Sequence, residues 1–211
     1  MISPMNISGG VSNTPLILFQ PFNIVVFLSF FSPIIIAFSM ASMSFIFQNF
    51  KGFIFLGYLL GFSFIRAYIY TLNGYDPLKD QPTICNSVQY AKYGNSSFSS
   101  FVFAFTIMYL FLPMFTNGGI NFWIVSSLLS YFFIDLFIKI YKKCITNMND
   151  LFLNILMGLT SAAVIVALMY AGGSGNFLFY NETTSGNTQI CSMPSKQTFK
   201  CQVYKNGELV S

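Results

Sequence analysis

The sequence predicts an all-α fold, a polytopic bundle of about five transmembrane helices followed by a short C-terminal tail closed by a disulfide. Of the 211 residues, 55% are hydrophobic and only 8% are charged, whereas about a quarter of the residues in an ordinary soluble domain are charged. Five apolar stretches are also long enough to cross the roughly 30 Å hydrocarbon core of a bilayer as helices. These observations exclude a soluble cytosolic enzyme and a disordered chain.

The predicted spans differ in how they begin and how they are connected. The first is interrupted by Pro33, lacks a basic start and is too long for the apolar core of a signal peptide. A turn before Gly52 leads into the second, and a Gly-Gly turn joins the third and fourth as an antiparallel hairpin. The N-terminal segment covers residues 1–22, the spans lie near 23–47, 52–72, 98–115, 120–141 and 151–171, and the tail covers 172–211.

Five spans place the two ends of the chain on opposite sides of the membrane. The side that holds the N-terminus also holds Lys79, Lys92, Lys142 and Lys143, whereas the other side has only Lys51 close to a helix end. The positive-inside rule then puts the N-terminus in the cytosol and the tail outside. We therefore predict a multi-pass protein of a cellular membrane or a virion membrane.

The cysteines fit this orientation. Cys191 and Cys201 enclose a short loop in the tail, and a disulfide between them would persist in the oxidising compartment outside; two unpaired thiols are the alternative. Cys85 and Cys144 fall on the predicted reducing side and are expected to be free. Asn181 begins an Asn-Glu-Thr glycosylation sequence on the outer side.

Two ionisable residues, Arg66 and Asp135, fall inside predicted spans at similar depth. An unpaired charge at the bilayer centre costs roughly 3 kcal/mol, and a pair between them would offset that cost and could line a polar pocket. Alternatively, Arg66 extends to the interface and Asp135 faces a neighbouring helix or a loop.

Small residues predict close helix packing within the molecule. Gly57 and Gly61 form a GxxxG pattern in the second span, which allows two backbones to approach. The fifth span carries a comparable stripe of small side chains, namely Asn154, Gly158, Ser161 and Ala162.

Two segments resemble motifs of the membrane-bound type-2 phosphatidic acid phosphatases. The run that starts at Lys92 is similar to that family's Pro-Ser-Gly-His motif, with Gly94 kept and Asn95 in the place of the histidine. The segment that opens the fifth span is similar to the family's last motif, with Asp150 kept. In that motif Thr146 occupies the place of the nucleophilic histidine, Lys139 or Ile140 that of the arginine, and Gln81-Pro82 corresponds to the Arg-Pro of the first motif.

The resemblance implies a shared helical fold without the family's chemistry. Its phosphohistidine mechanism needs two histidines, and this chain contains none. Asn95 cannot donate a proton at neutral pH, and Thr146 is a weak nucleophile without a base. A relative of this kind would be a catalytically inactive pseudoenzyme.

No cofactor or metal is expected, because the cysteines form no CxxC pair and the most common nitrogen ligand is missing. A net charge of +4 without a basic cluster excludes a nucleic-acid partner. The leading hypothesis is a non-catalytic protein that is structural or binds other membrane or virion proteins within the lipid bilayer. The alternatives are a protein that binds anionic lipid headgroups through Lys79, Lys92, Lys142 and Lys143, and a transporter or channel with Arg66 and Asp135 in its path. In the simplest interpretation those lysines only set the orientation.

Overall fold

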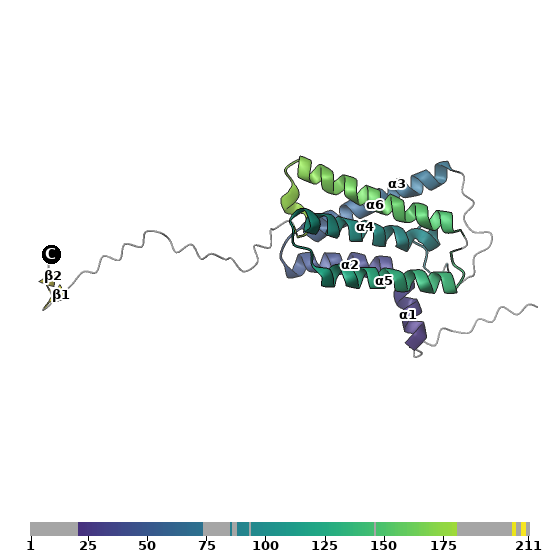
Figure 1. The fold of residues 1–211 in the computed structure, drawn as a ribbon, viewed down its shortest axis with the longest axis horizontal. Coiled ribbons are helices and arrows are strands. Elements are labelled where there is room, and N and C mark those ends of the chain that lie inside the picture. The colour runs from purple at the N-terminus through teal and green to yellow at the C-terminus, as the bar shows by residue number, and fades with distance from the viewer. Residues whose placement is uncertain are drawn as a thin grey trace, which may run out of the picture.

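The computed structural model describes residues 21–73, 85, 88–92, 94–145, 147–180, 204–205 and 208–209. Within them the chain forms an all-α bundle, and α2 to α6 lie alongside one another (Figure 1). A single 3-10 turn follows the last helix, and a pair of two-residue antiparallel strands lies near the C-terminus. The elements are α1 (Pro21–Phe30), α2 (Ser32–Ile46), α3 (Lys51–Leu72), α4 (Asn95–Thr116), α5 (Phe122–Tyr141), α6 (Met148–Ala171), η2 (Gly175–Phe177), β1 (Tyr204–Lys205) and β2 (Glu208–Leu209).

Four of the helices, α3 to α6, have the length and apolar composition needed to cross a membrane. They correspond to the second to fifth predicted spans, so the all-α class is confirmed for the described bundle. Their outward faces are apolar, with Phe64 75% exposed and Phe137 70% exposed. An apolar surface of this extent is typical of helices solvated by lipid and not by water.

The first predicted span is not a single helix. It is divided into α1 and α2, which are bent by 69° relative to each other, and α1 projects from the bundle (Figure 1). Pro33 lies in the first turn of α2, where its fixed φ and missing N–H suit a helix start. The prediction of one kinked span is therefore corrected to a broken pair, which makes the total five spans only if the pair crosses the membrane together.

The central helix is α4, most of whose side chains are buried, and its most extensive partner is α6. A Cβ atom added at Gly158 of α6 would lie 2.5 Å from the carbonyl oxygen of Phe101 and 2.9 Å from the Cβ of Ala104. Only glycine allows the two backbones to approach this closely. The predicted packing role of the small-residue stripe on α6 is thus confirmed.

The predicted packing role of the GxxxG pattern is wrong. Gly57 and Gly61 lie on the exposed side of α3, and a Cβ atom added at either would meet no atom within 4 Å. The close approach on this helix is at Gly52 instead, where an added Cβ would lie 2.0 Å from the carbonyl oxygen of Met40 on α2.

The connections gather at the two ends of the bundle. The last turns of α3 and α5 and the first turns of α4 and α6 meet at one end, which we call the polar end. At the other end Asn117 donates a hydrogen bond to the carbonyl oxygen of Tyr180 over 3.0 Å, and Leu178 is fully buried. Turns, apolar contacts and hydrogen bonds such as this one close that end, whereas the buried charged side chains lie at the polar end.

Candidate functional site

Two hydrogen-bonded clusters lie inside the polar end, and both include residues from the first turns of α4. The arginine cluster consists of Arg66, Tyr70, Gly94, Ser97, Asp150 and Asn154. The lysine cluster consists of Ser29, Ser32, Ser99, Asp135 and Lys139. Ser97 faces the first cluster and Ser99 the second, since residues two apart point to different sides of a helix.

Arg66 connects three segments in the arginine cluster. Its side chain is fully buried, its Nε donates to Oδ1 of Asn154 over 2.6 Å, and one terminal nitrogen donates to the carbonyl oxygen of Gly94 over 2.7 Å. Gly94 has a φ of +58°, and an added Cβ would lie 2.7 Å from that same nitrogen. Only glycine fits both the backbone conformation and the space beside the guanidinium group.

The acidic residue of this cluster is Asp150, at the start of α6. Ser97 donates to its Oδ2 over 2.7 Å, and the Tyr70 hydroxyl donates to its Oδ1. Asn154 is fully buried and its Nδ2 contacts the Tyr70 hydroxyl at 2.6 Å. Tyr70 and Asn154 therefore bridge Arg66 and Asp150. The negative charge of Asp150 stabilises the positive charge of the arginine.

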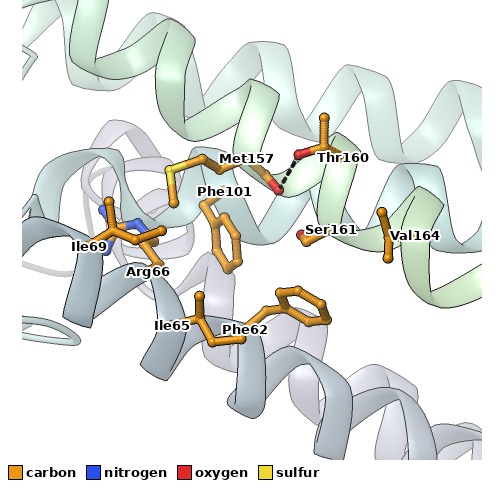
Figure 2. A pocket seen from close by; sticks show the side chains of 9 residues that line it. All are labelled: Phe62, Ile65, Arg66, Ile69, Phe101, Met157, Thr160, Ser161 and Val164. Carbon is orange, nitrogen blue, oxygen red and sulfur yellow. Dashed lines mark hydrogen bonds between the residues drawn. The ribbon is translucent and has the colours of Figure 1, made fainter.

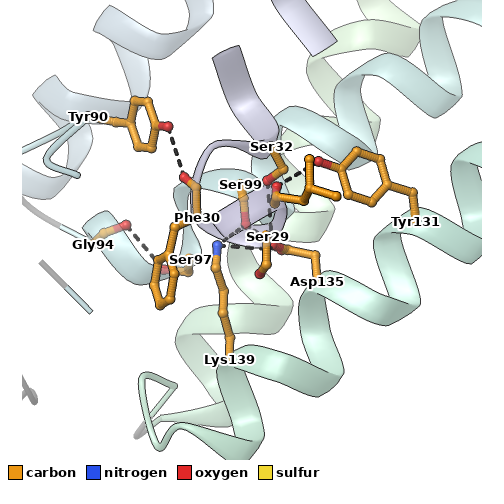
Figure 3. A network of polar contacts seen from close by, with 11 residues as sticks. Ser29, Phe30, Ser32, Tyr90, Gly94, Ser97, Ser99, Tyr131, Asp135 and Lys139 are labelled. Atoms are coloured by element: carbon orange, nitrogen blue, oxygen red, sulfur yellow. Dashed lines mark hydrogen bonds and ion pairs between the residues drawn. The ribbon is translucent and has the colours of Figure 1, made fainter. Parts of the chain in front are cut away.

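The lysine cluster is built around a buried ion pair within α5. Nζ of Lys139 lies 3.4 Å from Oδ2 of Asp135, one helical turn away, and the two side chains are at most 4% exposed (Figure 3). Ser29 donates to Asp135 over 2.7 Å and Ser99 over 2.6 Å, and Lys139 donates to the Ser99 hydroxyl. The carboxylate thus has partners from α1, from α4 and from its own helix.

The lysine cluster also explains how the break between α1 and α2 is tolerated. Ser32, at the start of α2, donates to Asp135 over 3.4 Å. The Tyr131 and Tyr90 hydroxyls donate to the carbonyl oxygens of Leu28 and Phe30 over 2.7 and 2.9 Å (Figure 3). Backbone groups in a membrane must find partners inside the protein, and these side chains provide them.

Tyr90 lies in the described segment 88–92, which Asn95 holds in place. The Asn95 carbonyl accepts from the backbone N–H of Tyr90 over 2.8 Å, and its amide donates to the carbonyl oxygen of Val88 over 2.8 Å. Burial, with the charge of Asp135 as a smaller cause, raises the pKa of Tyr90 to about 12. The hydroxyl therefore remains a donor at neutral pH.

The predicted partner of Asp135 is corrected. Asp135 pairs with Lys139 in the lysine cluster, whereas the hydrogen bonds of Arg66 lead to Asn154 and Gly94 in the other cluster. A spacing of four residues on one helix brings two side chains together, so Lys139 reaches Asp135 without any tertiary contact.

The lysines predicted to bind a headgroup fall into different environments. Lys92 and Lys143 are exposed and Lys142 is half-buried, with its Nζ 5.8 Å from the centre of the Tyr141 ring. Lys79 lies outside the described residues.

The positions that resemble the phosphatase motifs are only partly described. Gly94 and Asp150 belong to the arginine cluster, Asn95 holds segment 88–92, and Lys139 belongs to the lysine cluster. Ile140 is exposed. The remaining positions, Gln81, Pro82 and Thr146, lie outside the described residues, so the expected convergence of the three motifs stays a prediction.

A disulfide joins Cys85 to Cys144, with 5.4 Å between the two Cα atoms. The expectation that these two cysteines are free is wrong, because Cys85 is bonded to Cys144 in the connection between α5 and α6. Both are buried, in an apolar cluster with Val26, Phe30 and Ile138. The other predicted pair, Cys191 and Cys201, and the glycosylation site at Asn181 lie outside the described residues.

Among the described residues, cavities open between the helices. One, of about 270 Å³, lies between α3 and α6 and is lined by Phe62, Thr160 and Ser161 among others. Figure 2 shows the guanidinium group of Arg66 at its edge, directed away from Ser161 and Val164. Another, of about 430 Å³, lies between α2, α3 and α4 and includes Lys92.

Among the described residues, no three His, Cys, Asp or Glu side chains are placed to hold a metal ion together. Comparison with family models, curated proteins and solved structures gives no match to this chain.

Proposed function

We propose that the chain is a non-catalytic, multi-pass membrane protein, which acts by binding lipids or other proteins in the membrane. The observation that carries this proposal is the charge balance of the polar end. Lys139 balances Asp135 directly, and Arg66 balances Asp150 through Tyr70 and Asn154. Buried charges arranged in this way stabilise a helix bundle without facing a substrate.

Two serine hydroxyl groups of α4 that bond to these charges are poor nucleophiles in this arrangement. Ser97 is 2% exposed and Ser99 is 1% exposed. Each already donates its proton to a carboxylate, and Ser99 also accepts from Lys139. An activated nucleophile needs a base and an approaching substrate, and a substrate would first have to displace these contacts.

A degenerate form of the type-2 phosphatidic acid phosphatase fold is our proposal for the origin of this arrangement. It is supported by the position of Gly94 and Asp150, which lie at the starts of two helices and belong to one cluster. The chain contains no histidine, whereas the mechanism of this family needs two. This difference supports a role in binding and not in catalysis.

Membrane location and turnover can be tested with the full chain. We expect the protein to stay in the membrane fraction after alkaline carbonate extraction, and recovery in the supernatant would overturn the membrane location. Protein in lipid nanodiscs should release no more phosphate from phosphatidic acid than empty nanodiscs do. Release that Asp150→Asn or Asn95→Ala abolishes would overturn the non-catalytic role.

We also propose that the polar end faces an oxidising compartment, opposite to the side that the lysines predict. The Cys85–Cys144 disulfide supports this orientation, because disulfides persist in oxidising compartments and are rare in the cytosol. The positive-inside rule counts charges in loops, and Lys139, which adjoins one of those loops, is buried against Asp135.

Asn6-Ile-Ser is a further glycosylation sequence, near the N-terminus, and together with the one at Asn181 it provides the test. In a eukaryotic expression host, the proposed orientation with five spans predicts a glycan that Asn6→Gln removes and Asn181→Gln does not. A glycan removed only by Asn181→Gln would overturn it.

A further inference from the structure

The larger cavity has the form of a groove on the side of the bundle. Its walls are α2 and α3, its floor is formed by Phe98 and Val102 of α4, and segment 90–92 closes it toward the polar end. Its volume of about 430 Å³ lies in the range of ligand pockets, about 300–1,000 Å³.

The groove lies between α2 and α3, beside the place where these helices approach most closely. Near Gly52 the helices touch, and the Gly52 backbone N–H donates to the Ser44 hydroxyl over 2.7 Å. The lining toward the polar end includes three small side chains, namely Ala37 on α2 and Ser63 and Ala67 on α3. Ser63 donates to the carbonyl oxygen of Leu59 in its own helix, so the groove wall is apolar in character.

The rim of the groove is also apolar. Ile34 is 49% exposed and Leu60 is 59% exposed, on helices whose outer faces we assign to lipid. An occupant must therefore enter from the hydrocarbon region and must be apolar along most of its length. Lys92 is exposed at the polar end of the groove, where a cation attracts an anionic group.

We propose that this groove binds one acyl chain of an anionic glycerophospholipid, with the lipid phosphate at the Lys92 ammonium group. Apolar walls hold the chain, and the cation at one end sets its direction and selects an anionic headgroup. This inference rests on the proposed membrane location and deepens it by naming the lipid class and its site.

The cavity between α3 and α6 is the natural control. It is also apolar and open to the side of the bundle, but its charged residue, Arg66, donates its hydrogen bonds to Gly94 and Asn154. Because Arg66 is fully buried, whereas Lys92 is exposed, we expect this cavity to show no preference for anionic lipid.

The test is the lipid retained by the purified full chain. The protein is reconstituted in nanodiscs that contain equal amounts of phosphatidylglycerol and phosphatidylcholine, and the bound lipids are counted by native mass spectrometry. We expect one retained phosphatidylglycerol. Lys92→Gln should weaken its binding about tenfold, as expected for the loss of one charge-assisted contact, and Ala37→Phe, which fills the groove, should abolish it.

Two control variants keep the test specific. Lys51→Gln removes a cation at the other end of the bundle, and Val164→Phe fills the cavity between α3 and α6; both should retain the lipid as the unchanged protein does. Equal retention of phosphatidylcholine, retention unaffected by Ala37→Phe, or full competition by glycerol phosphate without acyl chains would overturn the site.

A result against the lipid site can be distinguished from a result against the membrane location. Flotation of the unchanged chain with vesicles reports on the location alone. A chain that floats but shows no preference for phosphatidylglycerol contradicts only the lipid site. Lys92 is exposed, so Lys92→Gln should fold normally even if Ala37→Phe does not.

Discussion

The two clusters at the polar end balance their charges in different ways. In the lysine cluster the cation and the anion lie on the same helix, one turn apart, and serines from the break between α1 and α2 and from α4 complete the shell. In the arginine cluster the charges come from α3 and α6 and are linked by Tyr70 and Asn154. Asp135 is fully buried, whereas Asp150 is partly exposed.

This difference implies different functions in folding. The ion pair of the lysine cluster lies within α5 and needs no other helix. Ser29 and Ser32 then bind α1 and α2 to it through Asp135. The arginine cluster joins side chains of α3, α4 and α6. Its hydrogen bonds therefore form only when these three helices are packed together. Removing a charge should cost more where the remaining partner has no access to water.

The largest effect is expected for Lys139→Met. It leaves Asp135 buried without its cation, and we expect a loss of about 5 kcal/mol in the free energy of unfolding, the upper end for breaking a buried pair. Unfolding in mixed micelles, followed by circular dichroism, measures it. Lys142→Met is the matched control and should change stability by no more than about 0.5 kcal/mol.

The disulfide beside the lysine cluster, where the Cys144 N–H donates to the Lys139 carbonyl oxygen over 2.8 Å, is expected to contribute almost as much. It closes a loop of sequence separation 59, for which the chain-entropy model gives about 4 kcal/mol. The double variant Cys85→Ser/Cys144→Ser should unfold correspondingly earlier than the oxidised protein. Equal stability of the oxidised chain and this variant would show that the disulfide does not stabilise the fold by constraining the unfolded chain.

Arg66→Met should have a smaller effect than Lys139→Met. Asp150 keeps its bonds from Tyr70 and Ser97 and has access to water, so we expect a loss of about 3 kcal/mol, the lower end for a broken buried pair. The same unfolding measurement compares the two variants directly. If Arg66→Met were the more destabilising, the exposure of the remaining carboxylate would not determine the cost.

The smallest difference is expected between two serines. Ser29→Ala removes one of several donors to Asp135 and should cost about 1.5 kcal/mol, the lower value for a hydrogen bond to a charged group. Ser63→Ala removes a hydroxyl that bonds only within its own helix and should change the free energy of unfolding by less than about 0.5 kcal/mol. Equal losses in the free energy of unfolding for the two variants would indicate that the hydrogen bond from Ser29 to Asp135 does not contribute to stability.

The helices of the bundle could be predicted from the sequence because apolar runs of this length have few alternatives. The four candidate spans α3 to α6 and the packing stripe on α6 follow from such patterns. The break before Pro33 was visible only as a kink. Whether a proline bends a helix or starts a new one depends on partners for the freed carbonyl groups, here Tyr131 and Tyr90, which come from distant segments.

The clusters were predicted only in part. Arg66 and Asp135 were singled out as charges in apolar helices, but their partners were not. The four-residue spacing of Asp135 and Lys139 was the available signal for their pairing. For Asn154 the signal was a single amide inside an apolar helix. The Cys85–Cys144 bond had no such signal, because its two cysteines are 59 positions apart and the lysine count favoured free thiols.

A double-mutant cycle on Asp135 and Lys139 tests the structural role of the buried charges most directly. The free energy of unfolding is measured in mixed micelles for Asp135→Asn, Lys139→Met and the double variant. If the pair is a charge-neutral structural unit, the double variant should be more stable than Lys139→Met alone, with a coupling free energy of at least about 2 kcal/mol. If the losses in the free energy of unfolding of the two single variants simply add in the double variant, the pair is not a charge-neutral unit. Each charge would then contribute to stability independently of the other.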